Sequence, residues 1–368
     1  MQNLNESGQL NQTGLTEIGA LGLPAGEDSE AKQREMQQAA QLQAALQKEE
    51  RRRTARRNRK IVSRVSMGAD LYMLAMYAAQ YAFLGGAILL STVVAFEDAQ
   101  YDILDGIAAI ASVLFGCVLL WQYAARCRDQ GRLLPEDTVI RTILKREKRV
   151  SIRSFAAFAA MICLFQFIFS LSLELLEMLL NLFGLTIMNS PAMNADYTLS
   201  TPLMLYAVFI GPLAEEFVFR GIILKGLRPC GKVFAIVVSA LLFSLMHGDI
   251  QQLGFTFAAG LVMGYAAMEY SILVSYLIHV VNNGVLSELM LVLSEQISEN
   301  AYMAVSLVMT ALSAAYLIWF TIRNRRFLPQ YLRANPARPG AVSGLLNIWF
   351  LAFVVLCAAE TILTITPM

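Results

Sequence analysis

The sequence predicts an all-α fold: a polytopic transmembrane helical bundle of about eight to nine spans with a polar cavity inside the membrane. Of the 368 residues, 57% are hydrophobic and only 15% are charged, whereas a soluble domain is nearer ~25% charged. The mean hydropathy is +0.53. Apolar runs of about 20 residues, long enough to cross a bilayer, recur along the chain. This composition excludes an ordinary cytosolic enzyme.

The first 60 residues differ from the rest of the chain and form a cytoplasmic region in this interpretation. Residues 1–30 are rich in Asn, Gln, Gly, Ser and Glu, a composition typical of disorder. Residues 31–60 contain no Gly or Pro and favour a helix, which ends in a basic run from Arg51 to Lys60. We expect this run to bind membrane lipids rather than nucleic acid, because each basic residue beside anionic headgroups gains roughly 1 kcal/mol. No cleavable signal peptide is expected, since these residues lack an apolar core segment.

Nine apolar segments follow, and each is a candidate membrane span. Their approximate bounds are 70–95, 104–125, 154–184, 202–227, 233–249, 252–268, 271–293, 301–322 and 345–366. We divide the chain into the N-terminal region 1–60, the first two spans with a basic loop at 61–150, a core at 151–295, and the C-terminal spans at 296–368.

The distribution of Lys and Arg predicts how these spans are oriented, since cytoplasmic loops retain basic residues. The loop 126–153 carries nine basic residues and the connection 323–338 carries five. The loops 96–103 and 185–201 carry none. Basic and non-basic loops therefore alternate, which predicts a cytoplasmic N-terminus and an external C-terminus. We expect a multi-pass protein of a bacterial cell membrane.

The cysteines give no indication of a metal site or a disulfide framework. They are scattered singly and never form a CxxC pair. We expect buried, inert thiols at Cys117, Cys127, Cys163, Cys230 and Cys357.

Three charged residues lie close together inside one apolar segment, in the stretch Gly211–Gly221. A charge at mid-membrane costs at least ~2.5–3.5 kcal/mol, so each needs a partner or a function. On a helix, Glu216 and Arg220 are four residues apart and face the same way, with the acid first. Glu215 points about 100° away and has no partner in its own helix. An unpartnered buried carboxylate is a candidate general base.

Both histidines of the chain lie in neighbouring apolar segments. His247 follows Phe243 by four residues, and Asn283 follows His279 by one helical turn. Imidazole exchanges a proton near neutral pH, and the amide of Asn283 can donate to a developing oxyanion. Glu215 and His247 lie at similar expected depths, with His279 somewhat shallower, so the three side chains are expected to converge if the helices tilt.

Each of these residues also has a purely structural interpretation. The pair of Glu216 and Arg220 can hold two helices together without taking part in chemistry. A membrane histidine is more often a satisfied hydrogen-bonding group than a catalyst, and Asn283 can bridge helices. The combination of an unpaired acid, two histidines and an amide on neighbouring spans favours the functional interpretation.

This combination resembles the CPBP family, which contains the CAAX proteases and bacteriocin-processing proteins and is also called Abi. The family signatures EExxxR, FxxxH and HxxxN occur here in order. They are Glu215-Glu216…Arg220, Phe243…His247 and His279…Asn283. The resemblance covers roughly residues 150–295, which makes 151–295 a protease core in this interpretation.

The resemblance implies an intramembrane metalloprotease with its site in a polar cavity. By position, Glu215 and His247 would activate a water for attack on a peptide carbonyl. His279 and Asn283 would stabilise the oxyanion or help to hold a metal, and Glu216 and Arg220 would orient these groups. Two mechanisms remain open. In one, zinc is held by Glu215, His247 and His279; in the other, no metal takes part.

The implied substrate is a peptide or a lipidated protein in the membrane. Eukaryotic relatives trim prenylated CAAX proteins, and bacterial relatives are linked to peptide processing and bacteriocin immunity. Two alternatives come from other classes of function. One is a non-catalytic scaffold or immunity protein, and the other is a proton-coupled transporter. The transporter is disfavoured because the sequence contains no internal repeat.

Overall fold

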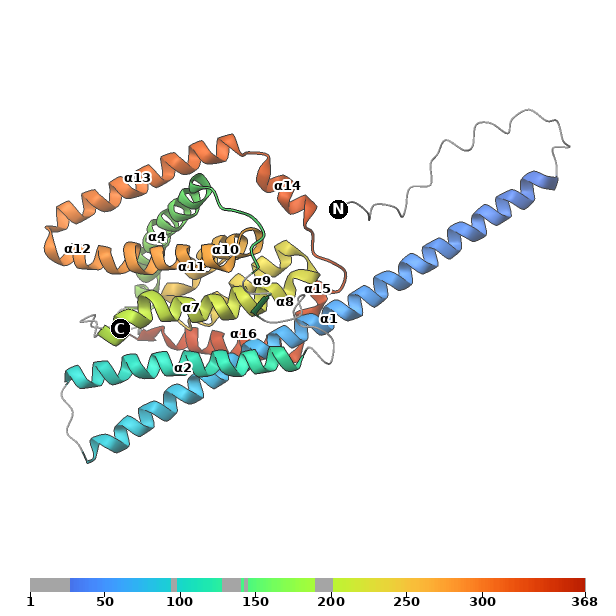
Figure 1. The fold of residues 1–368 in the computed structure, drawn as a ribbon. Coiled ribbons are helices and arrows are strands. Elements are labelled where there is room, and N and C mark those ends of the chain that lie inside the picture. Colours follow the sequence, from blue (N-terminus) through green and yellow to red (C-terminus); the bar gives the residue numbers. More distant parts are fainter. Residues whose placement is uncertain (1–26, 94–97, 128–139, 142–144, 189–200, 368) are drawn as a thin grey trace. The chain divides into compact units, whose positions relative to one another are not determined.

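The computed structural model describes residues 27–93, 98–127, 140–141, 145–188 and 201–367, which are almost entirely helical (Figure 1). The chain divides into two units, residues 1–53 and 54–368. In the described part of the first unit, residues 27–53 are helical, as predicted for 31–60. Residues 32–53 of this helix are solvent-exposed, and Arg53 Nε forms an ion pair with Glu49 Oε1 at 3.1 Å. The disorder predicted over 1–30 falls mostly outside the described residues.

The helices follow one another along the chain with short connections. The first half contains α1 (Glu27–Ser91), α2 (Asp98–Arg126), α4 (Ile152–Asn181), α6 (Thr201–Leu205), η2 (Tyr206–Ile210), α7 (Gly211–Glu215), η3 (Glu216–Ile223), α8 (Leu224–Leu227) and η4 (Arg228–Cys230). The second half contains α9 (Lys232–Leu245), α10 (Ile250–Glu269), α11 (Ile272–Val280), η5 (Val281–Leu289), α12 (Met290–Gln296), α13 (Glu299–Arg323), α14 (Phe327–Ala334), α15 (Ala341–Gly344) and α16 (Ile348–Leu363).

The predicted all-α bundle is confirmed. Five helical stretches of the described chain are long and apolar enough to cross a bilayer: Lys32–Ser91, Gln100–Arg126, Ile152–Asn181, Ile272–Gln296 and Glu299–Arg323. Lys232–Leu245 and Ile348–Leu363 are shorter apolar helices. The segment predicted at 202–227 is a run of short α and π turns rather than one regular helix. Where the structure describes them, the nine predicted segments are therefore mainly helical, and five of these described helices have the length and hydropathy of a full span.

A two-stranded antiparallel pairing joins distant parts of the second unit. β1 (Leu185–Thr186) pairs with β2 (Thr366–Pro367), in the register Leu185 with Pro367 and Thr186 with Thr366. The end of α4 and the end of the described chain therefore lie on the same side of the bundle, as the alternation of basic and non-basic loops predicts.

The predicted basic connections also lie together, at one end of the second unit. Arg228 Nη1 lies 2.6 Å from Glu147 Oε1, and the backbone N–H of Arg338 donates to Cys230 O at 2.9 Å. Asn58 Nδ2 donates to Pro339 O at 2.8 Å. These contacts support the predicted grouping of the loops, and the assignment of this end to the cytoplasm stays a prediction.

Glu269, at the end of α10, is the centre of an ionic cluster at this basic end. Its side chain is 6% exposed and lies 2.6 Å from Lys232 Nζ and 2.9 Å from Lys148 Nζ. The Tyr331 hydroxyl donates to Oε1 at 3.0 Å. Burial by itself would raise the pKa of Glu269, but these three hydrogen bonds outweigh it and lower the pKa to about 2.

We expect Glu269→Gln to lower the free energy of unfolding by about 2 kcal/mol at pH 7, because hydrogen bonds to a charged group contribute ~1.5–3 kcal/mol. The folded-state pKa lies below the unfolded value of about 4.3, so the carboxylate stabilises the fold above that pH. The difference between wild type and variant should shrink as the pH falls from about 4 towards 2. Thermal unfolding in detergent across this pH range measures it, and a difference that stays constant would contradict the ionic cluster.

Candidate active site

The candidate site begins at a break in helical regularity. Glu215 ends α7 and Glu216 begins the π-helical turn η3. Just before them, Gly211 lies so close to the preceding turn that a Cβ there would be 2.9 Å from Tyr206 O. Pro212 supplies no backbone N–H to the helix. Such π turns often occur at functional sites, and this one places two adjacent carboxylates at a helix junction.

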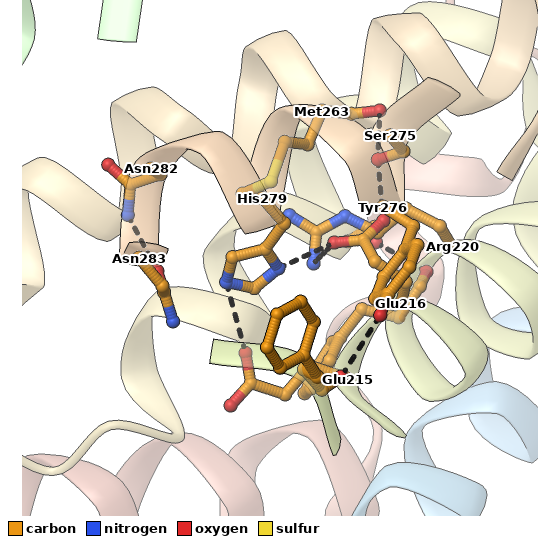
Figure 2. A network of polar contacts seen from close by, with 12 residues as sticks. Glu215, Glu216, Arg220, Met263, Ser275, Tyr276, His279, Asn282 and Asn283 are labelled. Atoms are coloured by element: carbon orange, nitrogen blue, oxygen red, sulfur yellow. Dashed lines mark hydrogen bonds and ion pairs between the residues drawn. The ribbon is translucent and has the colours of Figure 1, made fainter. Parts of the chain in front are cut away.

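Glu216 is the most highly connected polar residue of the site (Figure 2). Its side chain is completely buried, and Oε1 lies 3.3 Å from Arg220 Nη1 and 3.1 Å from His279 Nδ1. Oε2 accepts a hydrogen bond from Ser275 Oγ at 2.5 Å. The predicted Glu216–Arg220 pair is therefore present, and it also connects η3 to α11.

The guanidinium of Arg220 is held by electrostatics and an aromatic face. Its side chain is 0% exposed, and Cζ lies 4.1 Å from the centre of the Phe243 ring. Among the described residues, none of its three nitrogens makes a well-directed hydrogen bond, although Nη1 is within ion-pair distance of Glu216. The cation–π contact and the charge of Glu216 together offset the desolvation of this buried cation.

His279 lies between the two adjacent carboxylates (Figure 2). Its Nδ1 faces the Glu216 carboxylate, which can only accept a hydrogen bond when it is ionised, so Nδ1 carries a proton. Nε2 lies 3.5 Å from Oε2 of Glu215. Because two acceptors cannot bond without a hydrogen between them, Glu215 and His279 share a proton or face a common water. The Glu215 side chain is 19% exposed, so it is accessible to such a water.

His247 is oriented by the backbone of its own helix. Its Nδ1 lies 2.8 Å from Phe243 O, and because a carbonyl only accepts, Nδ1 carries the proton and Nε2 is left with a free lone pair. The Phe243 ring packs edge-to-face against both histidines, with ring centres 4.8 Å from His247 and 5.9 Å from His279. Among the described residues, no hydrogen bond or ion pair joins His247 to Glu215. The two histidines therefore meet through Phe243.

Asn283 ends a chain of amide hydrogen bonds. Gln166 Nε2 in α4 donates to Asn282 Oδ1 at 3.0 Å, and Asn282 Nδ2 donates to Asn283 Oδ1 at 2.8 Å. Asn283 Nδ2 donates to Ala207 O at 2.8 Å. A carboxamide carries two N–H groups, so Asn283 keeps one donor for a ligand.

Comparison with known proteins shows which family the part of the chain that holds this site is similar to. The family model described as type II CAAX prenyl endopeptidase Rce1-like matches residues 197–285. Over 92 residues the chain is 34% identical to the membrane-embedded CAAX protease MroQ of Staphylococcus aureus (strain USA300). Residues 197–285 of this chain are therefore similar to CAAX proteases, in agreement with the resemblance to the CPBP family.

The match to this family is confined to one part of the chain. It covers 23% of this chain and 37% of the Staphylococcus aureus relative. The matched residues 197–285 hold all six predicted site residues and are narrower than the range 150–295 expected from the motifs. No solved structure matches this chain.

The candidate site brings the predicted residues together unevenly. Glu216, Arg220 and His279 are in direct contact, and Glu215 faces His279. His247 is linked to this group through the Phe243 ring, which packs against both histidines. Asn283 is hydrogen-bonded to Asn282 and not to the charged residues.

The fit of the predicted zinc ligands differs between pairs. Glu215 Oε2 and His279 Nε2 are 3.5 Å apart, close to the roughly 3.3 Å expected of two ligands that lie ~2.0–2.1 Å from one tetrahedral ion. Within the described ranges, however, no three His, Cys, Asp or Glu side chains are grouped closely enough to hold a metal. This conformation does not assemble Glu215, His247 and His279 into a three-ligand site, and the zinc set stays a prediction.

Two residues of the candidate site were missed in the sequence. Ser275 bonds Glu216, and Gln166 starts the amide chain. Phe243 was noted as part of the FxxxH signature but was given no role, and it lies between the two imidazoles. Ser275 lies four residues before His279, on the same helical face, and this spacing could have indicated it. Gln166 lies 116 positions from Asn282, and no local pattern connects them.

Proposed function

We propose that this chain is an intramembrane endopeptidase that hydrolyses a peptide bond in a membrane-associated or lipidated protein. The proposal is carried by one observation: His279 lies between Glu215 and the completely buried Glu216–Arg220 pair, with contacts to both carboxylates. The family match supports this type of reaction, since the relative is named a CAAX protease and the family model a prenyl endopeptidase. A prenylated C-terminal peptide is therefore the first substrate class to test.

In the proposed reaction, Glu215 is the general base. It accepts a proton from a water as the water oxygen attacks the peptide carbonyl carbon. The free Nε2 of His247 accepts a second hydrogen bond from this water and helps to orient it. When the carbon–nitrogen bond breaks, the proton held by Glu215 passes to the leaving nitrogen. Atoms and charge balance without a co-reactant other than water.

Asn283 and His279 would stabilise the negative oxygen of the tetrahedral intermediate by donating hydrogen bonds to it. The remaining N–H of Asn283 can donate to it. Nε2 of His279 can donate as well when the proton that Glu215 took from the water moves to this nitrogen across their 3.5 Å contact, before it passes to the leaving nitrogen. The Glu216 carboxylate stabilises such an imidazolium through the 3.1 Å contact with Nδ1. Arg220 and Ser275 keep Glu216 ionised and fixed, so they act as positioning residues.

We assign no catalytic step to a metal. The 3.5 Å separation of Glu215 and His279 suits two ligands, but among the described residues no third ligand is gathered beside them. If zinc were bound, Glu215, His247 and His279 would hold it, and the ion would polarise the carbonyl and the water.

The proposed function is tested with the purified full chain in liposomes that contain a farnesylated CAAX peptide, with product detected by mass spectrometry. We expect cleavage, and we expect the rate to stay within about twofold of its initial value after treatment with a chelator such as 1,10-phenanthroline. A rate that is lost on chelation and restored by zinc would contradict the metal-free mechanism. Absence of cleavage for farnesylated and unmodified peptides alike would favour the non-catalytic scaffold.

A further inference from the structure

Three side-chain amides form a continuous row of hydrogen bonds that begins outside the family-matched residues. Gln166 in α4 donates from Nε2 to Asn282 Oδ1 at 3.0 Å, and Asn282 Nδ2 donates to Asn283 Oδ1 at 2.8 Å. Asn283 Nδ2 then donates to Ala207 O at 2.8 Å. The proposed function uses only the last amide of this row. The row therefore joins α4 to η5 and η2, and its first member has no assigned part in the reaction.

The row ends on a backbone carbonyl that lacks its helical partner. In η2 the register is that of a π-helix, and the N–H of Gly211 donates to Tyr206 O, five residues earlier. In the same register the N–H of residue 212 would donate to Ala207 O, but Pro212 has none. A carbonyl inside a protein needs a partner, and the Asn283 amide supplies it. Pro212 therefore leaves a fixed acceptor three residues before the first glutamate of the site.

This acceptor sets the direction of the whole row. A carbonyl oxygen can only accept a hydrogen bond, so the NH2 group of Asn283 must face Ala207. The Asn283 oxygen then faces the NH2 group of Asn282, whose own oxygen is left facing Gln166. Reversing the three amides would place Asn283 Oδ1 against Ala207 O, which are two acceptors without a hydrogen between them. Gln166 must therefore be the donor that completes the row.

The second N–H of Asn283 is free at the catalytic end of the row. Asn283 follows His279 by one helical turn (Figure 2), and its side chain is partly exposed, so the bundle does not enclose it. One N–H is fixed on Ala207 O, and the direction of the other depends on the plane of the carboxamide. The contact between Asn282 and Oδ1 holds that plane. A donor stabilises an oxyanion most when it is oriented before the reaction.

We propose that Gln166 is a positioning residue of the active site. Through Asn282 it holds the Asn283 carboxamide so that the free N–H is directed at the oxyanion. Without the Gln166 donor, Asn282 can turn, and Asn283 loses the contact that holds its plane. The inference rests on the proposed function and deepens it, because it extends the site from the family-matched residues 197–285 to α4.

The test is Gln166→Met in the full chain, measured with the farnesylated peptide in liposomes. Met keeps the length of the side chain but cannot donate a hydrogen bond. We expect kcat to fall about 5–20-fold while KM changes less than about threefold, because Gln166 acts on a donor to the transition state and not on the bound peptide. The midpoint of thermal unfolding should change little, since one such bond between membrane helices contributes little to stability on average.

A double-mutant cycle with Asn283→Ala separates positioning from a general effect on the structure. Asn283→Ala should lower kcat about 10²–10³-fold, as expected for a lost oxyanion donor. In that background Gln166→Met should lower kcat by less than about a further twofold, since its effect passes through Asn283. Asn58→Leu is the matched control, because Asn58 Nδ2 donates to Pro339 O at 2.8 Å at the basic end of the second unit. It should lower the unfolding midpoint and leave kcat within about twofold.

Gln166→Glu gives a second variant, which keeps the shape of the side chain and makes the donor depend on pH. A protonated carboxyl group donates an O–H to Asn282, whereas an ionised one only accepts and so opposes the direction of the row. We expect the kcat of this variant, relative to wild type at the same pH, to rise as the pH is lowered from about 8 to about 5. The same ratio for Gln166→Met should stay constant.

The outcomes separate this inference from the proposed function. An active wild-type chain whose kcat is unchanged in Gln166→Met would overturn the inference alone. An equal loss from Gln166→Met with and without Asn283→Ala would also overturn it, and so would a Gln166→Glu ratio that does not vary with pH. A wild-type chain that cleaves no probe would contradict the proposed function, and the inference would fall with it.

Discussion

Replacing Glu215 with Gln is expected to lower kcat by about 10²–10⁴-fold, the range typical of a lost general base. The amide keeps the size of the side chain but cannot accept the proton of the attacking water. KM should change little, because Glu215 acts on the water and not on the bound peptide. The rate of product formation from the farnesylated peptide in liposomes measures this effect.

The control for this variant is an acid of the bundle that makes no contact with the site. Glu174 is exposed in α4, and Glu174→Gln should leave kcat within about twofold. If Glu215→Gln cleaves the peptide at the wild-type rate while unfolding at the wild-type temperature, Glu215 is not the base.

Arg220→Leu is expected to lower the free energy of unfolding by about 3–5 kcal/mol, because it leaves the Glu216 carboxylate buried without its cation. Both side chains are 0% exposed, so water cannot replace the missing partner. Denaturation of the purified protein in mixed micelles, followed by far-ultraviolet circular dichroism, gives the change in stability.

The double variant Glu216→Gln with Arg220→Leu separates charge from packing. It removes both charges, so it should recover more than half of the stability that the single variant loses. Arg53→Ala is the control for an exposed pair, since its partner Glu49 lies at the surface, and it should cost less than about 1 kcal/mol. A single Arg220 variant as stable as wild type would show that the buried pair is not a source of stability.

The charged residues of the site could be predicted from the sequence, because a charge inside an apolar segment is costly in lipid and therefore rare without a function or a partner. Glu216 and Arg220 were expected to pair by their spacing of four, and they do. Depth alone placed Glu215 level with His247 and His279 somewhat shallower, whereas the structure brings Glu215 to 3.5 Å from His279. The all-α bundle followed in the same way from apolar runs of suitable length.

Neutral residues of the site could not be predicted because they look like ordinary interior residues. Gln166 and Ser275 are uncharged and lie in apolar helices, where an isolated amide or hydroxyl gives no sign of a functional site. Their roles depend on partners from other helices, such as Glu216 for Ser275 and Asn282 for Gln166. Only the packed structure brings these partners together.

The regularity of the fourth apolar segment was also overestimated. The sequence pattern indicates one helix over 202–227, but the structure has π turns at η2 and η3 around Gly211 and Pro212. A lost backbone donor at Pro212 and the close approach of Gly211 to Tyr206 disturb the regular hydrogen bonding there. Hydropathy reports burial of a segment and carries no information about this local irregularity.

The measurement that tests the proposed catalytic unit most directly is a double-mutant cycle on Glu215→Gln and His247→Ala. Residues that act on the same water are strongly non-additive, so the double variant should be little slower than the slower single variant. If the two losses in kcat instead multiply, Glu215 and His247 act independently and do not share one activated water.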